Sequence, residues 1–228
     1  MREIIKELAD LGTEEKRAVL MRFYKTGKGA YAEHDQFMGV RMPEVRSVAK
    51  RHLEANRETL EGLLMSPWHE ARLCGLLILT LRWRKASESE RAEIANFYLS
   101  HTDRVNNWDL VDLSAPTIVG EWLIYRPRTL LYKLAESSLL WDNRIAIVAT
   151  LALIRAGQLD DTFALATKMM HHRHDLMHKA IGWMLREAGK RDHDRLYQYV
   201  SEHRTEMPRT MLRYAIERFP QEERKRLL

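Results

Sequence analysis

The chain has little of the chemistry that cross-links or turns a backbone. Of its 228 residues, 1 is cysteine, 10 are glycine and 6 are proline. A lone cysteine excludes an intramolecular disulfide, and the apolar run around Cys74 indicates a buried thiol in a reducing compartment. Because glycine and proline are scarce, few turn signals exist for a strand-rich domain, and the composition favours helix.

Long apolar runs are also missing. No stretch approaches the roughly 20 residues of a membrane span, and residues 1–7 have the pattern of an amphipathic helix rather than of a signal peptide. We therefore expect a cytoplasmic protein. Hydrophobic residues make up 45% of the chain and charged residues 30%, which excludes a disordered protein.

The charge balance is basic. The formal net charge is +5 and the isoelectric point is about 9.3. Such a balance is compatible with binding to nucleic acid but does not require it, because a scattered lysine and arginine excess also occurs on ordinary solvated surfaces.

An internal repeat organises most of the chain. Apolar helical segments recur every roughly 34 to 36 residues, and they begin at Arg72, Trp108, Arg144, Lys179 and Arg213. Shorter amphipathic stretches lie between them, at 88–99, 128–135, 161–170 and 192–200. The repeating unit is therefore a helix pair, and such pairs stack side by side into an all-α solenoid because neither helix can cover its apolar face alone.

We predict one continuous domain over residues 1–228. Residues 66–228 follow the repeat, whereas residues 1–65 follow it less well and are expected to form an N-terminal helical cap. The helices of this cap are expected near 2–9, 13–23 and 43–53.

Punctuating residues support these helix boundaries. Gly157 and Gly189 stand where helices should stop. Asp160, Asp175 and Asp192 have the side chain and the position of N-caps.

The loop from Tyr24 to Tyr31 combines glycine with lysine. It lacks the Gly-x-x-x-x-Gly-Lys-Ser/Thr spacing of a phosphate-binding loop, which argues against a nucleotide site. Two interpretations stay open. The segment is either a flexible connection between helices or a contact to a DNA backbone through Lys25 or Lys28.

Four histidines cluster at positions 171, 172, 174 and 178. His174 and His178 share a helix face if both are helical. The segment lacks the His-Glu-x-x-His motif and has no nearby cysteine, so a solvated helix start is favoured over a metal site.

The most informative stretch runs from Asn106 to Pro116. Trp108 and Asp112 are four residues apart, which places an indole and a carboxylate on one helix face. Pro116 has no N–H for the carbonyl of Asp112 and should loosen or kink the helix there. From these residues alone, the favoured interpretation makes Trp108 a packing residue and Asp112 a first-turn charge stabilised by the helix dipole.

The sequence resembles the DNA alkylation repair glycosylases with HEAT-like repeats, of the AlkD type, over nearly its whole length. Three separated motifs in the same order argue against coincidence. They are Trp108-Asp-Leu-Val-Asp112 with Pro116-Thr-Ile-Val-Gly120, Asn143-Arg-Ile-Ala-Ile147, and Lys179-Ala-Ile-Gly-Trp-Met-Leu-Arg-Glu187. The stretches Phe23-Tyr-Lys-Thr-Gly-Lys-Gly29 and Phe37-Met-Gly-Val-Arg-Met-Pro43 resemble the start of such proteins.

The resemblance implies a right-handed α-α superhelix that holds duplex DNA on its concave face. It places Asp112 in the catalytic role and Trp108 and Trp183 beside the lesion or its sugar. Arg144, Lys179, Lys25 and Lys28 are the expected DNA-backbone contacts. Two positions depart from some relatives: Asn107 replaces a tryptophan, and Ala152 replaces a basic residue.

The implied activity is hydrolysis of the N-glycosidic bond of N3- or N7-alkylated purines, leaving an abasic site without a metal or cofactor and without a deep base-flipping pocket. The expected partner is duplex DNA with alkylated bases, and we expect a monomer. Two alternatives stay open, which are a non-catalytic DNA-binding relative and a helical scaffold for protein partners.

Overall fold

The computed structural model describes residues 1–33 and 35–228, and the chain divides into two compact units, Met1–Ser114 and Ala115–Leu228. Among the described residues the secondary structure is helical, apart from an isolated bridge between Gln36 and Trp68. No described helix is long and apolar enough to cross a membrane. The expectation of one domain with a boundary at residue 65 stays a prediction.

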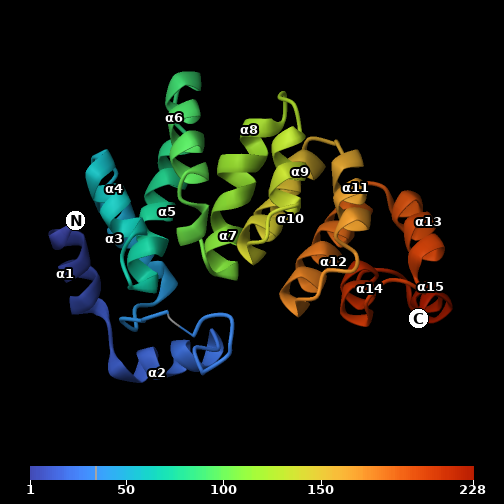
Figure 1. Cartoon of the computed structure of the whole chain (residues 1–228), viewed down its shortest axis with the longest axis horizontal. Coiled ribbons are helices and arrows are strands. Elements are labelled where there is room, and N and C mark those ends of the chain that lie inside the picture. The colour runs from blue at the N-terminus through green and yellow to red at the C-terminus, as the bar shows by residue number, and fades with distance from the viewer. Residues whose placement is uncertain (34) are drawn as a thin grey trace. The chain divides into compact units, whose positions relative to one another are not determined.

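The first unit is built around α5 (His69–Trp83), which is buried over most of its length. It packs against α1, α3, α4 and α6 (Figure 1), so its apolar run is covered on every side. Burial raises the pKa of Cys74 on this helix to about 12, as expected for an inert core thiol. The other helices are α1 (Arg2–Leu11), α2 (Glu14–Phe23), α3 (Met42–Arg51), α4 (Arg57–Leu64), α6 (Glu88–Leu99), the 3₁₀ helix η1 (Thr102–Arg104) and α7 (Trp108–Ala115).

The second unit is built in the same way around α10 (Leu140–Arg155), which packs against α9, α11, α12 and a π-helix called η2. Where α12 meets α14, a Cβ at Gly182 would lie 2.6 Å from the carbonyl oxygen of Met211, so glycine allows the close approach. The other elements are η2 (Pro116–Gly120), α8 (Glu121–Leu123), α9 (Thr129–Ala135), α11 (Asp160–Lys168), α12 (Asp175–Gly189), α13 (His193–His203), α14 (Arg209–Ala215) and α15 (Gln221–Leu227).

Most of the predicted helices are confirmed, with small shifts at their ends. The three helices of the cap and the four shorter stretches appear as α1, α2, α3, α6, α9, α11 and α13. The segment predicted to begin at Arg213 is helical only to Ala215, and residues 216–218 form turns. Helices α4, α8 and α15 have no counterpart among the predicted helices. Gly157, with φ of 78°, follows α10, and Asp192 caps α13 by accepting a hydrogen bond from the N–H of Arg195. The N-cap prediction is wrong for Asp160 and Asp175, which are the first helical residues.

A buried carboxylate ties the segment before α3 to α5. The side chain of Glu70 accepts hydrogen bonds from the backbone N–H groups of Met38, Gly39 and Val40. Gly39 has φ of 86°, and a Cβ there would lie 2.2 Å from the carbonyl oxygen of Thr13. Only glycine fits this close approach, which holds the start of α2 against the same segment.

Candidate functional site

The candidate site of the first unit is built on the start of α7. Asn107 is fully buried, and its Oδ1 accepts a hydrogen bond of 2.8 Å from the backbone N–H of Trp108. Trp108 and Asp112 follow one helical turn apart, and both are half-buried. Their spacing therefore places indole and carboxylate on one helix face, as predicted. Asn107, which stands where some relatives have a tryptophan, is buried here and accepts the backbone hydrogen bond at the start of α7.

The helix changes its hydrogen bonding after Asp112. Pro116 begins a π-helix, η2, which confirms the loosened turn predicted from the missing N–H of this proline. Within the second unit, η2 lies tightly against α10. A Cβ at Gly120 would come within 2.8 Å of the Cβ of Ala152, which is itself 4% exposed, so residue 152 packs against η2.

Three aromatic residues hold the indole of Trp108. The ring of Tyr24 stacks on it, with centroids 5.4 Å apart and planes 24° from parallel. Phe23 meets it edge-on at 5.8 Å and is itself 60% exposed. Nε1 of Trp108 donates a hydrogen bond of 3.1 Å to the hydroxyl of Tyr31. Stacking and a hydrogen bond together fix the plane of the indole and its rotation within that plane.

A buried ionic network lies behind these rings. His69, which is 2% exposed, places Nδ1 3.2 Å from Oδ2 of Asp35 and Nε2 2.9 Å from Oδ2 of Asp109. Asp35 also accepts hydrogen bonds from the guanidinium of Arg72 and from the amide of Asn107. The network therefore joins α5, α7 and the segment before α3 through charged groups.

The network shifts the pKa values of its members. Burial alone would lower the pKa of His69, but attraction to Asp109 and hydrogen bonds to Asp109 and Asp35 outweigh it and raise that pKa to about 9. Burial would raise the pKa of Asp35, yet its bonds to His69 and Arg72 lower it overall. Burial and the neighbouring Asp109 carboxylate raise the pKa of Tyr24 far above its usual value. His69 is thus an imidazolium at neutral pH, and Tyr24 a neutral hydrogen-bond donor.

Lys25 and Lys28 lie exposed in the loop after α2. Lys25 has φ of 55°, in the left-handed region that favours glycine. It stands one residue past the C-cap, where the N–H of Thr26 reaches back to the carbonyl of Met21 and ends the helix. This ending places the exposed Lys25 directly after Tyr24.

In the second unit, the predicted residues gather at α12. The guanidinium of Arg144 donates a hydrogen bond of 2.7 Å to the carbonyl of Leu176 in the first turn of that helix, and Arg144 itself is only 5% exposed. Lys179 forms an ion pair of 2.7 Å with Asp175. Trp183, which is half-buried, follows Lys179 by one helical turn and so shares its face.

The histidine segment precedes and enters α12. His174 is the N-cap, and its Nδ1 accepts a hydrogen bond from the N–H of Leu176. Burial and the neighbouring histidines lower the pKa of His172 and of His174. In residues 1–33 and 35–228, no group of three or more acidic, histidine or cysteine side chains is arranged to hold a metal ion.

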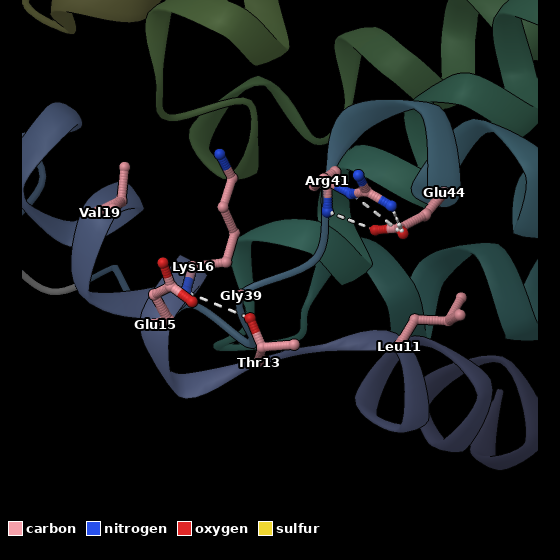
Figure 2. Close-up of a pocket in the computed structure, with 8 residues that line it drawn as sticks. All are labelled: Leu11, Thr13, Glu15, Lys16, Val19, Gly39, Arg41 and Glu44. Carbon is pink, nitrogen blue, oxygen red and sulfur yellow. Dashed lines mark hydrogen bonds and ion pairs between the residues drawn. The ribbon is translucent and has the colours of Figure 1, made fainter.

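A pocket of about 450 Å³ lies elsewhere in the first unit, where α1, α2 and α3 begin or end (Figure 2). Its polar side chains are used locally: Thr13 caps α2, and Arg41 pairs with Glu44. None of the residues predicted for the site lines it. This pocket is therefore not the candidate site.

Sequence reasoning missed the residues behind Trp108, namely Tyr24, Asp35, His69, Asn107 and Asp109. A signal was present in the polar stretch His69-Glu-Ala-Arg72, which stands directly before the apolar run 73–79. Charged residues at the start of a fully buried helix need partners, and that need points to a network.

Comparison with known proteins agrees with the resemblance seen in the sequence. A family model described as "DNA alkylation repair enzyme" matches residues 4–219. A solved structure from Enterococcus faecalis, titled as a predicted DNA alkylation repair enzyme, is 18% identical and superposes with a TM-score of 0.71 over 92% of this chain and 97% of that chain. This likeness confirms the predicted fold class, an α-α superhelix of helical repeats. No curated protein matches the chain.

Proposed function

This chain belongs to the family of DNA alkylation repair enzymes, and on that premise we propose that it is a DNA glycosylase. The proposed reaction hydrolyses the N-glycosidic bond of cationic N3- or N7-alkylpurines in duplex DNA and leaves an abasic site. It takes place in the cytoplasm on a monomeric enzyme and uses no metal or cofactor. The observation that carries the proposal is the pairing of Asp112 with a firmly held Trp108 on one face of α7.

The chemistry of the lesion suits these two residues. Alkylation at N3 or N7 makes the purine cationic and a good leaving group, so little is required of a general acid. As the C1′–N bond breaks, positive charge develops on the deoxyribose, as it does on the sugar in glycoside hydrolysis. The carboxylate of Asp112 stabilises that charge and orients the attacking water, while the indole of Trp108 presents its π face to a cation.

The remaining predicted residues act on DNA mainly through its negatively charged phosphates. Lys25 and Lys28 contact phosphates without reading sequence, which accounts for their exposure. From the second unit, Trp183 offers another π face, and Lys179 binds the backbone. Arg144 is the further backbone contact expected from the resemblance, but it is 5% exposed, so its guanidinium must move to reach a phosphate. The hydrogen bond from Arg144 to Leu176 ties that arginine to the turn of α12 that precedes Lys179.

A glycosylase assay tests the proposal. The pure protein is incubated with a duplex that carries one 7-methylguanine, and alkali then cleaves the abasic sites. We expect wild type to yield strand cleavage and Asp112→Asn to lose roughly 10²- to 10³-fold in single-turnover rate while still binding the duplex. Asp103→Asn, which makes the same change on the exposed η1, is the matched control and should stay active.

Two outcomes would contradict the proposal in different ways. A wild-type protein that binds the duplex but releases no base is a non-catalytic DNA-binding relative. A fully active Asp112→Asn variant would remove Asp112 from the catalytic role while leaving the glycosylase activity in place.

A further inference from the structure

Four charged side chains are buried together behind Trp108. His69 and Arg72 face Asp35 and Asp109, and each of the four is at least nine-tenths buried. If His69 is an imidazolium, two positive charges balance two negative ones. If it is neutral, the cluster holds an uncompensated negative charge in the protein interior, which is strongly unfavourable.

The hydrogen-bond geometry also favours the imidazolium form of His69. Both ring nitrogens of His69 face carboxylate oxygens, which only accept hydrogen bonds. A neutral imidazole carries a single N–H and would turn a lone pair towards one of these carboxylates. Oδ1 of Asp109 has no hydrogen-bond partner among the described residues, so the contacts of this carboxylate run through Oδ2.

Helix stability does not explain a cation at this position. His69 is the first residue of α5, where the helix dipole disfavours positive charge. The centroid of its ring lies 4.6 Å from that of Phe37 and 4.9 Å from that of Tyr24, and the π faces of such rings attract a cation. Replacing a buried ion pair by well-packed apolar residues often leaves the stability of a protein unchanged or raises it. We therefore expect the role of these charges to lie in the defined positions that they give to their neighbours.

Two routes lead from His69 to the indole of Trp108. Along the first, Asp109 accepts the hydroxyl hydrogen of Tyr24, whose ring stacks on the indole. Along the second, Asp35 accepts a hydrogen bond from Asn107, which caps the backbone N–H of Trp108. One imidazolium therefore holds both the ring and the backbone of the residue beside the proposed lesion site.

We propose that His69 is a positioning residue: clamped as an imidazolium between Asp35 and Asp109, it holds Tyr24 and Asn107, and through them the Trp108 indole, in the orientation required for base release. The inference rests on the proposed function only for the effect on base release. The charge of His69 and the position of the Trp108 indole can be measured without DNA. The charged and titratable groups that face His69 are Asp35, Asp109, Arg72 and Tyr24.

The first experiment measures charge and position in the free protein. With ¹⁵N-labelled histidine, we expect both ring nitrogens of His69 to show imidazolium shifts at pH 8, because the pKa is about 9. With 5-fluorotryptophan labelling, the Trp108→Phe variant assigns the fluorine resonance of Trp108. In wild type this resonance should shift as the pH rises, with a midpoint near pH 9. In His69→Gln it should stay constant over the same pH range. A neutral His69 at pH 8, or a Trp108 signal with no such transition in wild type, overturns the proposal.

The second experiment separates positioning from general destabilisation. Ile78→Val, a buried change on the same helix, is the control, since it removes one core methyl group without touching the network. We expect His69→Gln to lower the single-turnover rate on a saturating 7-methylguanine duplex at least tenfold, with affinity for undamaged duplex unchanged within twofold. An unchanged rate, or equal losses in His69→Gln and Ile78→Val, overturns the positioning role. Absence of base release in wild type overturns the proposed function instead, and the spectroscopic result still decides the position of Trp108.

Discussion

The hydroxyl of Tyr24 donates a hydrogen bond of 2.9 Å to Oδ2 of Asp109, 85 residues away in sequence. This bond joins the exposed basic loop after α2 to the buried network behind α7. It also fixes the ring that stacks on Trp108. A single hydroxyl thus connects the surface expected to meet DNA with the residues expected to act on it.

Replacing Tyr24 by phenylalanine keeps the stacked ring and removes this hydrogen bond. Because the Asp109 carboxylate is buried, we expect a loss of about 1–3 kcal/mol in the free energy of unfolding, together with slower base release. Urea denaturation and a single-turnover assay measure the two effects. Tyr132→Phe is the matched control, since Tyr132 donates the same kind of bond to Asp161 in the second unit, and it should leave base release unchanged.

Replacing Lys25 by glycine should strengthen the fold and weaken DNA binding. Glycine accepts the left-handed backbone found there without the steric cost that lysine bears, so we expect a gain of about 0.5–1 kcal/mol in stability. Loss of one phosphate contact should reduce the slope of log K against log salt by about 1. The control, Lys28→Ala, should show the same change in DNA binding without the gain in stability. If the salt dependence of Lys25→Gly equals that of wild type, Lys25 does not contact DNA.

Stability should fall as the pH rises through the titration of His69. The pKa of His69 is about 9 in the folded protein and about 6.5 in an unfolded chain. The folded state therefore binds the extra proton between these values, and its contribution is complete below pH 6.5 and lost as the pH passes 9. Urea denaturation at pH 6.5 and pH 9 should show wild type losing roughly 3 kcal/mol more than His69→Gln. Parallel losses in both proteins would mean that His69 is neutral when folded.

The close approach of η2 to α10 predicts that Gly120→Ala is strongly destabilising. The added Cβ would lie 2.2 Å from the carbonyl oxygen of Ala149, a contact that only backbone movement can relieve. We expect a loss of at least about 2 kcal/mol, as in overpacked cores, measured by thermal unfolding. Gly27→Ala, where nothing lies within 4 Å of the new Cβ, is the control and should be nearly neutral.

Local pattern was sufficient for most of the helical architecture. The repeat of apolar segments predicted α5, α7, α10 and α12, because a helix must bury one face and its spacing records that need. The fifth segment, predicted to begin at Arg213, shares only residues 213–215 with α14. The same local logic placed Trp108 and Asp112 on one face and predicted the loosened turn at Pro116. The exact helix starts were harder to predict, as the N-caps misassigned to Asp160 and Asp175 show, because helix ends shift by one or two residues without a change in the apolar pattern.

The sequence by itself determined the helix pairs, their spacing and the shared helix face of Trp108 and Asp112, since these depend on neighbours within one or two turns. The roles of these two residues came from the family resemblance. Only the tertiary structure decided that Asp35, His69 and Asp109 form one network, because residues 34 to 74 positions apart meet through packing that no local period records. The tertiary structure also decided that Arg144 is buried and that the backbone of Lys25 adopts a left-handed conformation. The partners of a buried charge are selected by the fold, and so the position of the Trp108 indole is a property of the folded chain.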